Sequence, residues 1–299
     1  MATLYITSTA NTGTGTLRTL ISSATAGDTI QPAPEIFPKG TLCSVSLTET
    51  LSINTNGLNI KGGQTRLVIT STGAILHYVT TNYYDVDFIE MTSNSDGCIL
   101  QSNSYSLYFT RCSFCGLVAS TAPIFLNNKK SCEIVCKDCA FYGNRASRKT
   151  TGGYGAVCHG SSANASNSSY INCTFGANFS SSGLHYNYTP GTLTNTISSV
   201  DEVSEWRTPP PSSYTYNSWT ATAYKSMDPR PSSTASWRTG ATSTTSTVDL
   251  DGNPRKSNGA KGAYEYYVGK LATPDVTVVQ VQKTGAMLQW LEITNRTSF

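Results

Sequence analysis

The most regular hydrophobic pattern in the chain is a Cys followed two residues later by a Phe. Residues 112–114, 139–141 and 173–175 read Cys-Ser-Phe, Cys-Ala-Phe and Cys-Thr-Phe. Positions i and i+2 of a strand face the same side. The motif recurs at intervals of roughly 30 residues, a length typical of one strand per coil of a solenoid. The pattern therefore predicts stacked coils with Cys on Cys and Phe on Phe in the interior.

The same alternation extends toward the N-terminus. Residues 58–60 and 86–88 repeat it, and the steps from Ile60 to Phe88 and from Phe88 to Phe114 are close to the later ones. Clusters of Gly, Asn, Asp or Ser, which suit tight turns, separate these rungs. We therefore predict an all-β, right-handed parallel β-helix. The alternative, an antiparallel sandwich, would show hairpin signals at a much shorter spacing.

The first thirty residues predict a cap on the solenoid. Residues 4–6 read as a short strand, and four apolar residues then lie on one helical face: Leu17, Leu20, Ile21 and Ala24. Thr16 can cap the start of this helix and Gly27 its end. Such a helix would shield the apolar end and open strand edge of a solenoid.

Neither a cofactor nor a nucleic acid is expected. Residues 13–15 (Gly-Thr-Gly) lack the third glycine of a dinucleotide fingerprint, and no βαβ alternation follows them. Charged residues make up 13% of the chain and the net charge is +3, so there is no electrostatic footprint for nucleic acid. The basic clusters at residues 129–130 and 145–149 read as solvated loop charges.

The nine cysteines are an odd number, so at least one thiol is unpaired or bonds outside the chain. Cys112 with Cys115, and Cys136 with Cys139, have the spacing of a metal knuckle. Because Cys112 and Cys139 also belong to the inward ladder, we interpret them as small buried hydrophobes and expect no metal. A chain of 299 residues can bury a large core without disulfides.

From about residue 187 the pattern changes. Proline clusters interrupt regular strands at residues 190, 209–211 and 229–231, and Tyr and Trp accumulate. We predict an excursion that packs along the solenoid flank, with the aromatics as its core. Some rings could instead stack on sugar faces, and His159 and His185 could share a face near them. The candidate ligand-binding residues are Tyr154, His159, His185, Tyr186 and Trp206.

Two terminal motifs resemble a known group of proteins. Residues 13–18 with 26–30, and residues 249–255 with 262–266, are similar to the segments that begin and end surface β-helix proteins of the polymorphic outer-membrane protein and choice-of-anchor Q families. Between them, residues 172–175 resemble the rung repeat. The resemblance covers residues 3–266 and implies a surface protein. Ala260-Lys261 departs from the acidic and apolar pair usual before Gly262.

The start of the chain is a second departure from those families. Met1-Ala2-Thr3 leads directly into the capping strand without the apolar region of a secretion signal, and no apolar run is long enough to cross a membrane. The sequence therefore suggests a mature form, export by another route, or a virion component that needs no signal. Each places the protein outside the cell or on a cell or virion surface.

The end of the chain resembles the start of a fibronectin type III module. Residues 277–279 and 286–291 are similar to the first two strands of such a sandwich, which needs roughly 90 to 100 residues. We expect this tail either to begin a further domain or to dock on another subunit. The expected parts are a cap at 1–30, β-helix rungs at 31–186, the excursion and terminal rungs at 187–268, and the tail at 269–299.

Two classes of function remain open. The acids near the rungs do not predict the carboxylate cluster of a polysaccharide lyase or hydrolase, and residues 249–253 resemble a calcium loop but lack its distal Glu. We therefore expect a non-catalytic structural or adhesive β-helix protein that binds a surface glycan or protein and belongs to a larger assembly or homo-oligomer. The alternative is a polysaccharide lyase or glycoside hydrolase.

Overall fold

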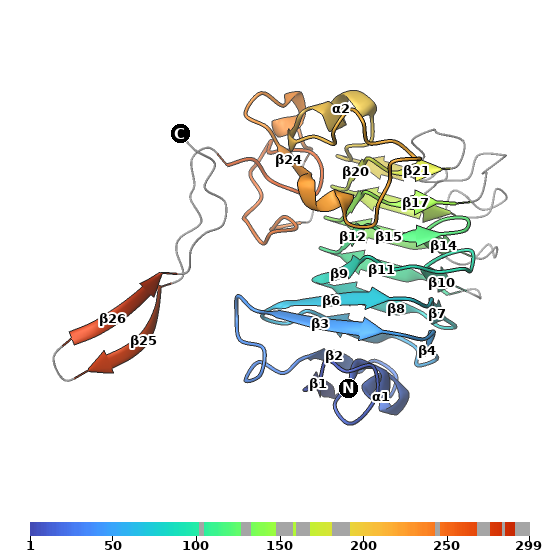
Figure 1. Ribbon diagram of the computed structural model, residues 1–299, viewed down its shortest axis with the longest axis vertical. Helices are drawn as coiled ribbons and strands as arrows, with labels where there is room; N and C mark the ends of the chain where they lie inside the picture. Colours follow the sequence, from blue (N-terminus) through green and yellow to red (C-terminus); the bar gives the residue numbers. More distant parts are fainter. Residues whose placement is uncertain are drawn as a thin grey trace. The chain divides into compact units, whose positions relative to one another are not determined.

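The computed structural model describes residues 1–101, 105–126, 133–147, 158–159, 168–180, 192–242, 246–267, 276–282 and 285–290. The chain divides into two units, Met1–Tyr266 and Tyr267–Phe299. The first unit is a β-solenoid of about 6 turns built from stacked parallel strands (Figure 1). The predicted parallel β-helix is therefore confirmed.

Parallel sheets form the faces of the solenoid. In stacking order, the eight-stranded sheet contains β1 (Thr3–Ile6), β2 (Thr29–Pro32), β5 (Leu58–Lys61), β8 (Thr81–Tyr84), β11 (Leu107–Thr110), β15 (Ile134–Lys137), β19 (Ser168–Ile171) and β22 (Thr192–Thr194). The six-stranded sheet contains β3 (Leu42–Leu47), β6 (Arg66–Ser71), β9 (Val86–Ile89), β12 (Ser113–Cys115), β16 (Ala140–Tyr142) and β20 (Thr174–Gly176).

Two shorter sheets complete the coils. The five-stranded sheet contains β4 (Leu51–Ile53), β7 (Ile75–His77), β10 (Ile99–Gln101), β14 (Ile124–Leu126) and β18 (Cys158–His159). The three-stranded sheet contains β13 (Val118–Ala119), β17 (Arg145–Ala146) and β21 (Phe179–Ser180).

The Cys and Phe ladders are present as predicted. Phe114, Phe141 and Phe175 stack face to face, with ring centroids 4.6 and 4.4 Å apart. The three ladder cysteines are fully buried at the corner before each of these strands. Each follows a residue of positive φ, at 51°, 55° and 51° for Arg111, Asp138 and Asn172. The corner thus turns in the left-handed region, which Asp and Asn tolerate better than most residues.

The predicted ladder is wrong at its N-terminal end. Ile60 lies in β5 of the eight-stranded sheet, where it pairs with Tyr83. The residue beneath Phe88 is Ile69, and Val45 lies beneath that. Every strand of a coil has the same inside-outside alternation, so the repeat length alone did not identify the sheet to which residues 58–60 belong.

Helix α1 (Leu17–Ser23) covers the N-terminal end of the solenoid (Figure 1). The Thr16 side chain caps it, and Leu17 and Ile21 are buried against the solenoid core. The predicted end at Gly27 is wrong, because the Ala24 N–H closes the last turn on the Leu20 carbonyl. Gly27, at φ 82°, lies in the turn that enters β2.

The aromatic excursion packs on the solenoid flank, as the sequence predicts. It contains α2 (Val200–Ser204), β23 (Trp206–Thr208), β24 (Asp228–Pro231) and the 3-10 helices η2 (Ala223–Ser226) and η3 (Ser236–Arg238). Its main apolar cluster joins Trp206, Met227 and Trp237 to Ala177 and Ile197 of the last coils. A Cβ at Gly176 would lie 2.4 Å from the Trp206 ring, so only glycine admits this contact.

One ion pair and several hydrogen bonds hold the end of the excursion against the corners of earlier coils. Arg255 Nη2 lies 2.7 Å from Asp138 Oδ1, and both side chains are almost fully buried. Ser246 also donates a hydrogen bond to Asp138. Arg66 in turn donates to the Leu250 carbonyl at 3.3 Å. Residues 246–255 are therefore held against coils that precede them by more than a hundred residues.

The second unit contains the antiparallel pair β25 (Val276–Gln282) and β26 (Gly285–Trp290). Its resemblance to a fibronectin module stays a prediction. A search of the described residues finds no helix with the length and apolar character that a membrane span requires.

Candidate functional site

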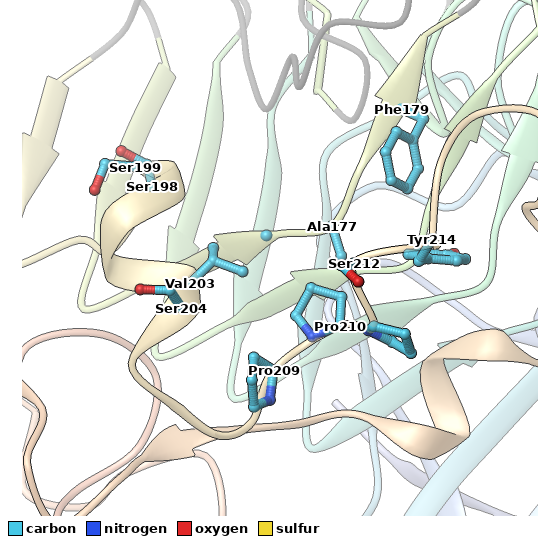
Figure 2. A pocket seen from close by; sticks show the side chains of 12 residues that line it. Ala177, Phe179, Ser198, Ser199, Val203, Ser204, Pro209, Pro210, Ser212 and Tyr214 are labelled. Carbon is cyan, nitrogen blue, oxygen red and sulfur yellow. The ribbon is translucent and has the colours of Figure 1, made fainter.

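A pocket of about 350 Å³ lies where the last coil meets the excursion (Figure 2). Its walls come from the end of β20, from β21, from α2 and from the segment after β23. Prolines and aromatic rings supply most of its apolar surface and serines its hydroxyls. Its lining includes Phe179, Ser198, Ser199, Val203, Ser204, Pro209, Pro210, Pro211, Ser212 and Tyr214.

Helix α2 and the residues just before it carry the serines Ser198, Ser199 and Ser204 on one side of the pocket. The helix begins with a capping box, in which the Ser199 side chain accepts from the Glu202 N–H and the Glu202 carboxylate accepts from the Ser198 and Ser199 N–H groups at 2.9 and 2.8 Å. This exchange fixes the first turn. Because its carboxylate is engaged by the backbone, Glu202 serves the helix rather than the pocket.

Tyr214 forms the opposite, aromatic side of the pocket. Its ring packs edge to face on Phe179 with centroids 5.0 Å apart, and its N–H donates to the Pro211 carbonyl at 2.8 Å. The Tyr214 hydroxyl is buried and has no partner among the described residues. Burial also raises the pKa of Tyr214. The ring of Tyr214, rather than its hydroxyl, is therefore what this residue presents to the pocket.

The aromatic surface continues beyond the pocket along β17 and β21. Arg145 of β17 is the cross-strand partner of Phe179 in β21, so both face the same side of the sheet. The Arg145 guanidinium carbon lies 4.2 Å from the Tyr216 ring centroid and 5.6 Å from that of Trp219. We call Tyr214, Tyr216 and Trp219, which are partly exposed, the aromatic strip; Phe179 is buried beneath it.

The segments that build this surface carry few acids. Residues 139–200 and 206–227 contain no Asp or Glu. The intervening acids belong to α2 and its C-cap, where Glu205 accepts hydrogen bonds from Ser236 at 2.7 and 2.8 Å. The pocket and strip therefore offer hydroxyls, flat rings and one cation to a ligand.

The five sequence-predicted site residues do not come together as one site among the described residues. Trp206 is only 2% exposed and packs on Gly176, so its ring belongs to the core and has no face for a sugar, which corrects that assignment. His159 lies in β18, paired with Phe125. Tyr154, His185 and Tyr186 lie outside the described residues.

The sequence places Tyr214, Tyr216 and Trp219 among the aromatics of the excursion but does not single them out as the site, and it does not reveal Phe179. One signal was available, because the outward positions of β12, β16 and β20 include small residues such as Ala140 and Gly176 rather than charged ones. Such positions indicate that another segment covers the strand. Which segment does so depends on contacts between residues far apart in the chain.

The acids near the rungs do form a cluster, contrary to the sequence-based expectation. Arg66 lies 2.6 Å from Asp87 and 3.9 Å from Asp85. Arg66 binds both oxygens of Asp87, and Arg111 binds both oxygens of Asp85 at 2.7 Å. These bidentate pairs engage the oxygens that a general acid or base would need. The chemistry of the cluster is that of a structural ion network.

No group of three or more His, Cys, Asp or Glu side chains within the described part of the chain is arranged to hold a metal. In residues 249–253 the Asp249 carboxylate accepts from the Asn253 backbone and side chain and from the Glu265 N–H, so this run forms a turn. Cys112 lies in the interior ladder, whereas Cys115 lies on the outer side of β12, where it is the cross-strand neighbour of Tyr142.

Comparison with models of known protein families gives no match for this chain. A search of curated proteins likewise finds no relative.

Proposed function

We propose that this chain is a non-catalytic β-helix protein of a virion or cell surface, and that the pocket and aromatic strip bind a glycan. β-Solenoids occur both in adhesins and in polysaccharide-acting enzymes. The observation that carries the proposal is the pocket of about 350 Å³, where apolar rings face hydroxyls. The resemblance of the terminal motifs to surface proteins agrees with it.

The chemistry of the pocket suits a sugar better than a hydrocarbon. Sugar rings have apolar faces that pack on aromatic and proline rings, and hydroxyl edges that exchange hydrogen bonds. The buried Tyr214 hydroxyl has no partner among the described residues. The serine hydroxyls and the apolar rings of the lining, and not this phenol oxygen, are therefore the groups that can contact a sugar.

An enzyme is the second candidate, and the cluster of Asp85 and Asp87 is the observation that favours it. Glycosidases place two carboxyl groups about 5 to 9.5 Å apart, and both of these carboxylates contact Arg66. We favour binding because arginine pairs engage both of them, and because neither lines the pocket.

The cysteines support a virion rather than an exported surface protein. Six cysteines of the described residues are buried free thiols, namely Cys43, Cys98, Cys112, Cys115, Cys139 and Cys173. Burial raises the pKa of Cys43 to about 11 and that of Cys98 to about 12, which makes these thiols inert in the fold. A chain unfolded in an oxidising compartment would expose them to disulfide formation. We infer that the protein folds in a reducing compartment and then joins a virion.

Two variants at one residue test glycan binding. Tyr214→Phe removes only the buried hydroxyl and keeps the ring, so the protein should be at least as stable as the wild type and keep its glycan affinity. Tyr214→Ala should weaken binding about tenfold or more. Tyr78→Phe, at a tyrosine 37% exposed, is the matched control. A glycan array identifies the ligand, and calorimetry measures it.

Two results would contradict the proposal. One is that the wild-type protein binds no glycan on the array. The other is that Tyr214→Ala binds as the wild type does.

The tail supports a role in assembly. β25 and β26 form a separate two-stranded pair, and an isolated hairpin is marginally stable in water. We propose that residues 271–299 begin a further domain or pack on another subunit. A chain that ends at Lys270 should keep the β-helix by circular dichroism but lose assembly by sizing. A monomeric full chain that matches the shortened form would contradict this.

A further inference from the structure

Arg145 is a cation that forms no ion pair with any of the residues that the structure describes. Ion pairs between described residues engage Arg66, Arg111, Arg207, Arg230, Arg255 and Lys225, but not Arg145. The Arg145 Nε is buried and has no hydrogen-bond partner in the described part of the chain. Since residues 139–200 contain no Asp or Glu, the neighbouring sequence supplies no carboxylate either.

Two aromatic rings hold this guanidinium in place. Tyr216 and Trp219 lie 4.2 and 5.6 Å from its carbon. Trp219 Nε1 donates to the Gly143 carbonyl at 2.7 Å, and the Tyr216 hydroxyl donates to the Ser147 carbonyl at 3.4 Å. Both rings are thus anchored to backbone on either side of β17. Stacking uses the faces of a guanidinium, whereas its donors point outward in its plane.

The position of Arg145 connects it to the pocket. It lies opposite Phe179, whose ring packs on Tyr214 in the pocket wall. Neighbouring strands of a sheet are about 4.8 Å apart. Arg145 therefore lies on the strand next to the one that supplies Phe179 to the pocket wall.

We propose that Arg145, held by Tyr216 and Trp219, binds the carboxylate of an acidic sugar, so that the ligand of the aromatic strip is an acidic glycan. A planar guanidinium matches a carboxylate with two parallel hydrogen bonds. The acid-free segments around it do not repel such a ligand. This inference rests on the proposed glycan-binding function and names the class of glycan.

The test compares sugars that differ only in charge. The probes are trigalacturonate and 3′-sialyllactose, each beside its own methyl ester, titrated by calorimetry at low and high salt. The wild type should bind an acidic member at least tenfold more tightly than its neutral partner, and added salt should weaken only the acidic member.

Substitutions at Arg145 separate charge from geometry. Arg145→Gln should lower affinity for the acidic member about tenfold to a hundredfold and leave the neutral member unchanged. Arg145→Lys keeps the charge but loses the planar fork, so its loss should be intermediate. Arg238→Gln is the matched control, because Arg238 is exposed and also lies over a tyrosine, Tyr266 at 5.8 Å. Thermal melts check that each variant folds.

Each outcome has one meaning. If acidic and neutral sugars bind equally, or if Arg145→Gln binds as the wild type does, the acid-binding role is wrong while glycan binding stands. If none of the four sugars binds and the glycan array is also blank, both proposals are wrong. If polyglutamate binds in an Arg145-dependent manner and the sugars do not, the ligand is an acidic peptide.

Discussion

The two ends of the solenoid are closed in different ways. At the N-terminal end the seven-residue helix α1 adds Leu17 and Ile21 to the solenoid's own core. Toward the C-terminal end the excursion builds separate apolar clusters around Trp206 and Tyr264. A short helix is thus sufficient to shield an open coil. The larger cover does more than shielding requires, and the pocket lies beneath it.

The two regions also differ on the outer face of the same sheet. Strand β3 alternates between exposed and buried residues along its length, whereas β12 is buried at every position. The outward residues of β3 meet water, and those of β12 meet the excursion. The regular coils form the scaffold, and the irregular excursion that packs on them forms most of the pocket wall.

The largest expected effect is on the column of stacked phenylalanines in the solenoid core. Phe141 stacks between Phe114 and Phe175, so Phe141→Ala should lower the free energy of unfolding by about 3 to 5 kcal/mol. Denaturant unfolding should show circular dichroism and tryptophan fluorescence moving together. Leu42→Ala, at a leucine 60% exposed, is the control. An effect as small as that of the control would contradict the ladder.

The next effect is confined to the excursion. Arg255→Met leaves the carboxylate of Asp138 buried without its cation, which should cost about 3 kcal/mol or more. Tryptophan fluorescence should then report unfolding at lower denaturant than circular dichroism does. Arg230→Met removes a more exposed pair with Asp251 and should cost under about 1 kcal/mol. Equal losses for the two variants would show that the buried pair does not fasten the excursion.

The third effect is a pH dependence of the free energy of unfolding that comes from His77 in the N-terminal coils. His77 is fully buried, its Nδ1–H donates to the Leu100 carbonyl at 3.0 Å, and its Nε2 accepts from the Tyr83 hydroxyl at 2.7 Å. Burial lowers its pKa from 6.5 to about 4. The folded state disfavours protonated His77. The contribution of neutral His77 to the free energy of unfolding is therefore complete above pH 6.5 and is lost as the pH falls toward 4.

The size of the His77 effect follows from linkage. The shift corresponds to about 3 kcal/mol between these limits. His77→Leu removes the titrating group, so the difference in stability between wild type and variant should shrink as the pH falls from 6.5 to 4. A constant difference across this interval would mean that His77 is not held neutral.

The smallest effect is at the N-terminal cap. Thr16 accepts from the Thr19 N–H and donates to the Gly13 carbonyl at 2.8 Å. Thr16→Ala should cost about 1 kcal/mol, measured as a lower melting temperature, and should leave the excursion's fluorescence unchanged. Thr14→Ala, at an exposed threonine, is the control. A loss as large as that of Phe141→Ala would mean that the helix holds the solenoid together.

The repeating features of the solenoid were predicted from the sequence, whereas contacts without a repeat were missed. The ladders at Cys112 and Phe114 follow from two local facts, strand alternation and a nearly constant coil length. Ile60 was assigned to the wrong sheet because both facts hold for every strand of a coil. The end of α1 was misplaced because Gly27 suits a helix end and a turn equally well.

The candidate site could not be predicted to the same degree. Tyr214 and Phe179 meet although they are distant in the sequence, and Asp138 and Arg255 are more distant still. Neither contact has a period or a local motif. The cluster of Asp85 with Arg66 was missed for a related reason, since its members lie on different strands and at a corner of the coil.

The stacking of the phenylalanines has a consequence for how such a protein can change. The coil between Phe141 and Phe175 is longer than the one between Phe114 and Phe141, yet the three rings remain in one unbroken column. Extra residues can therefore enter a coil without disturbing the register of its neighbours. Lineages of this fold could exchange surface segments while inheriting the same interior, and an engineer could use the coils as a display scaffold in the same way.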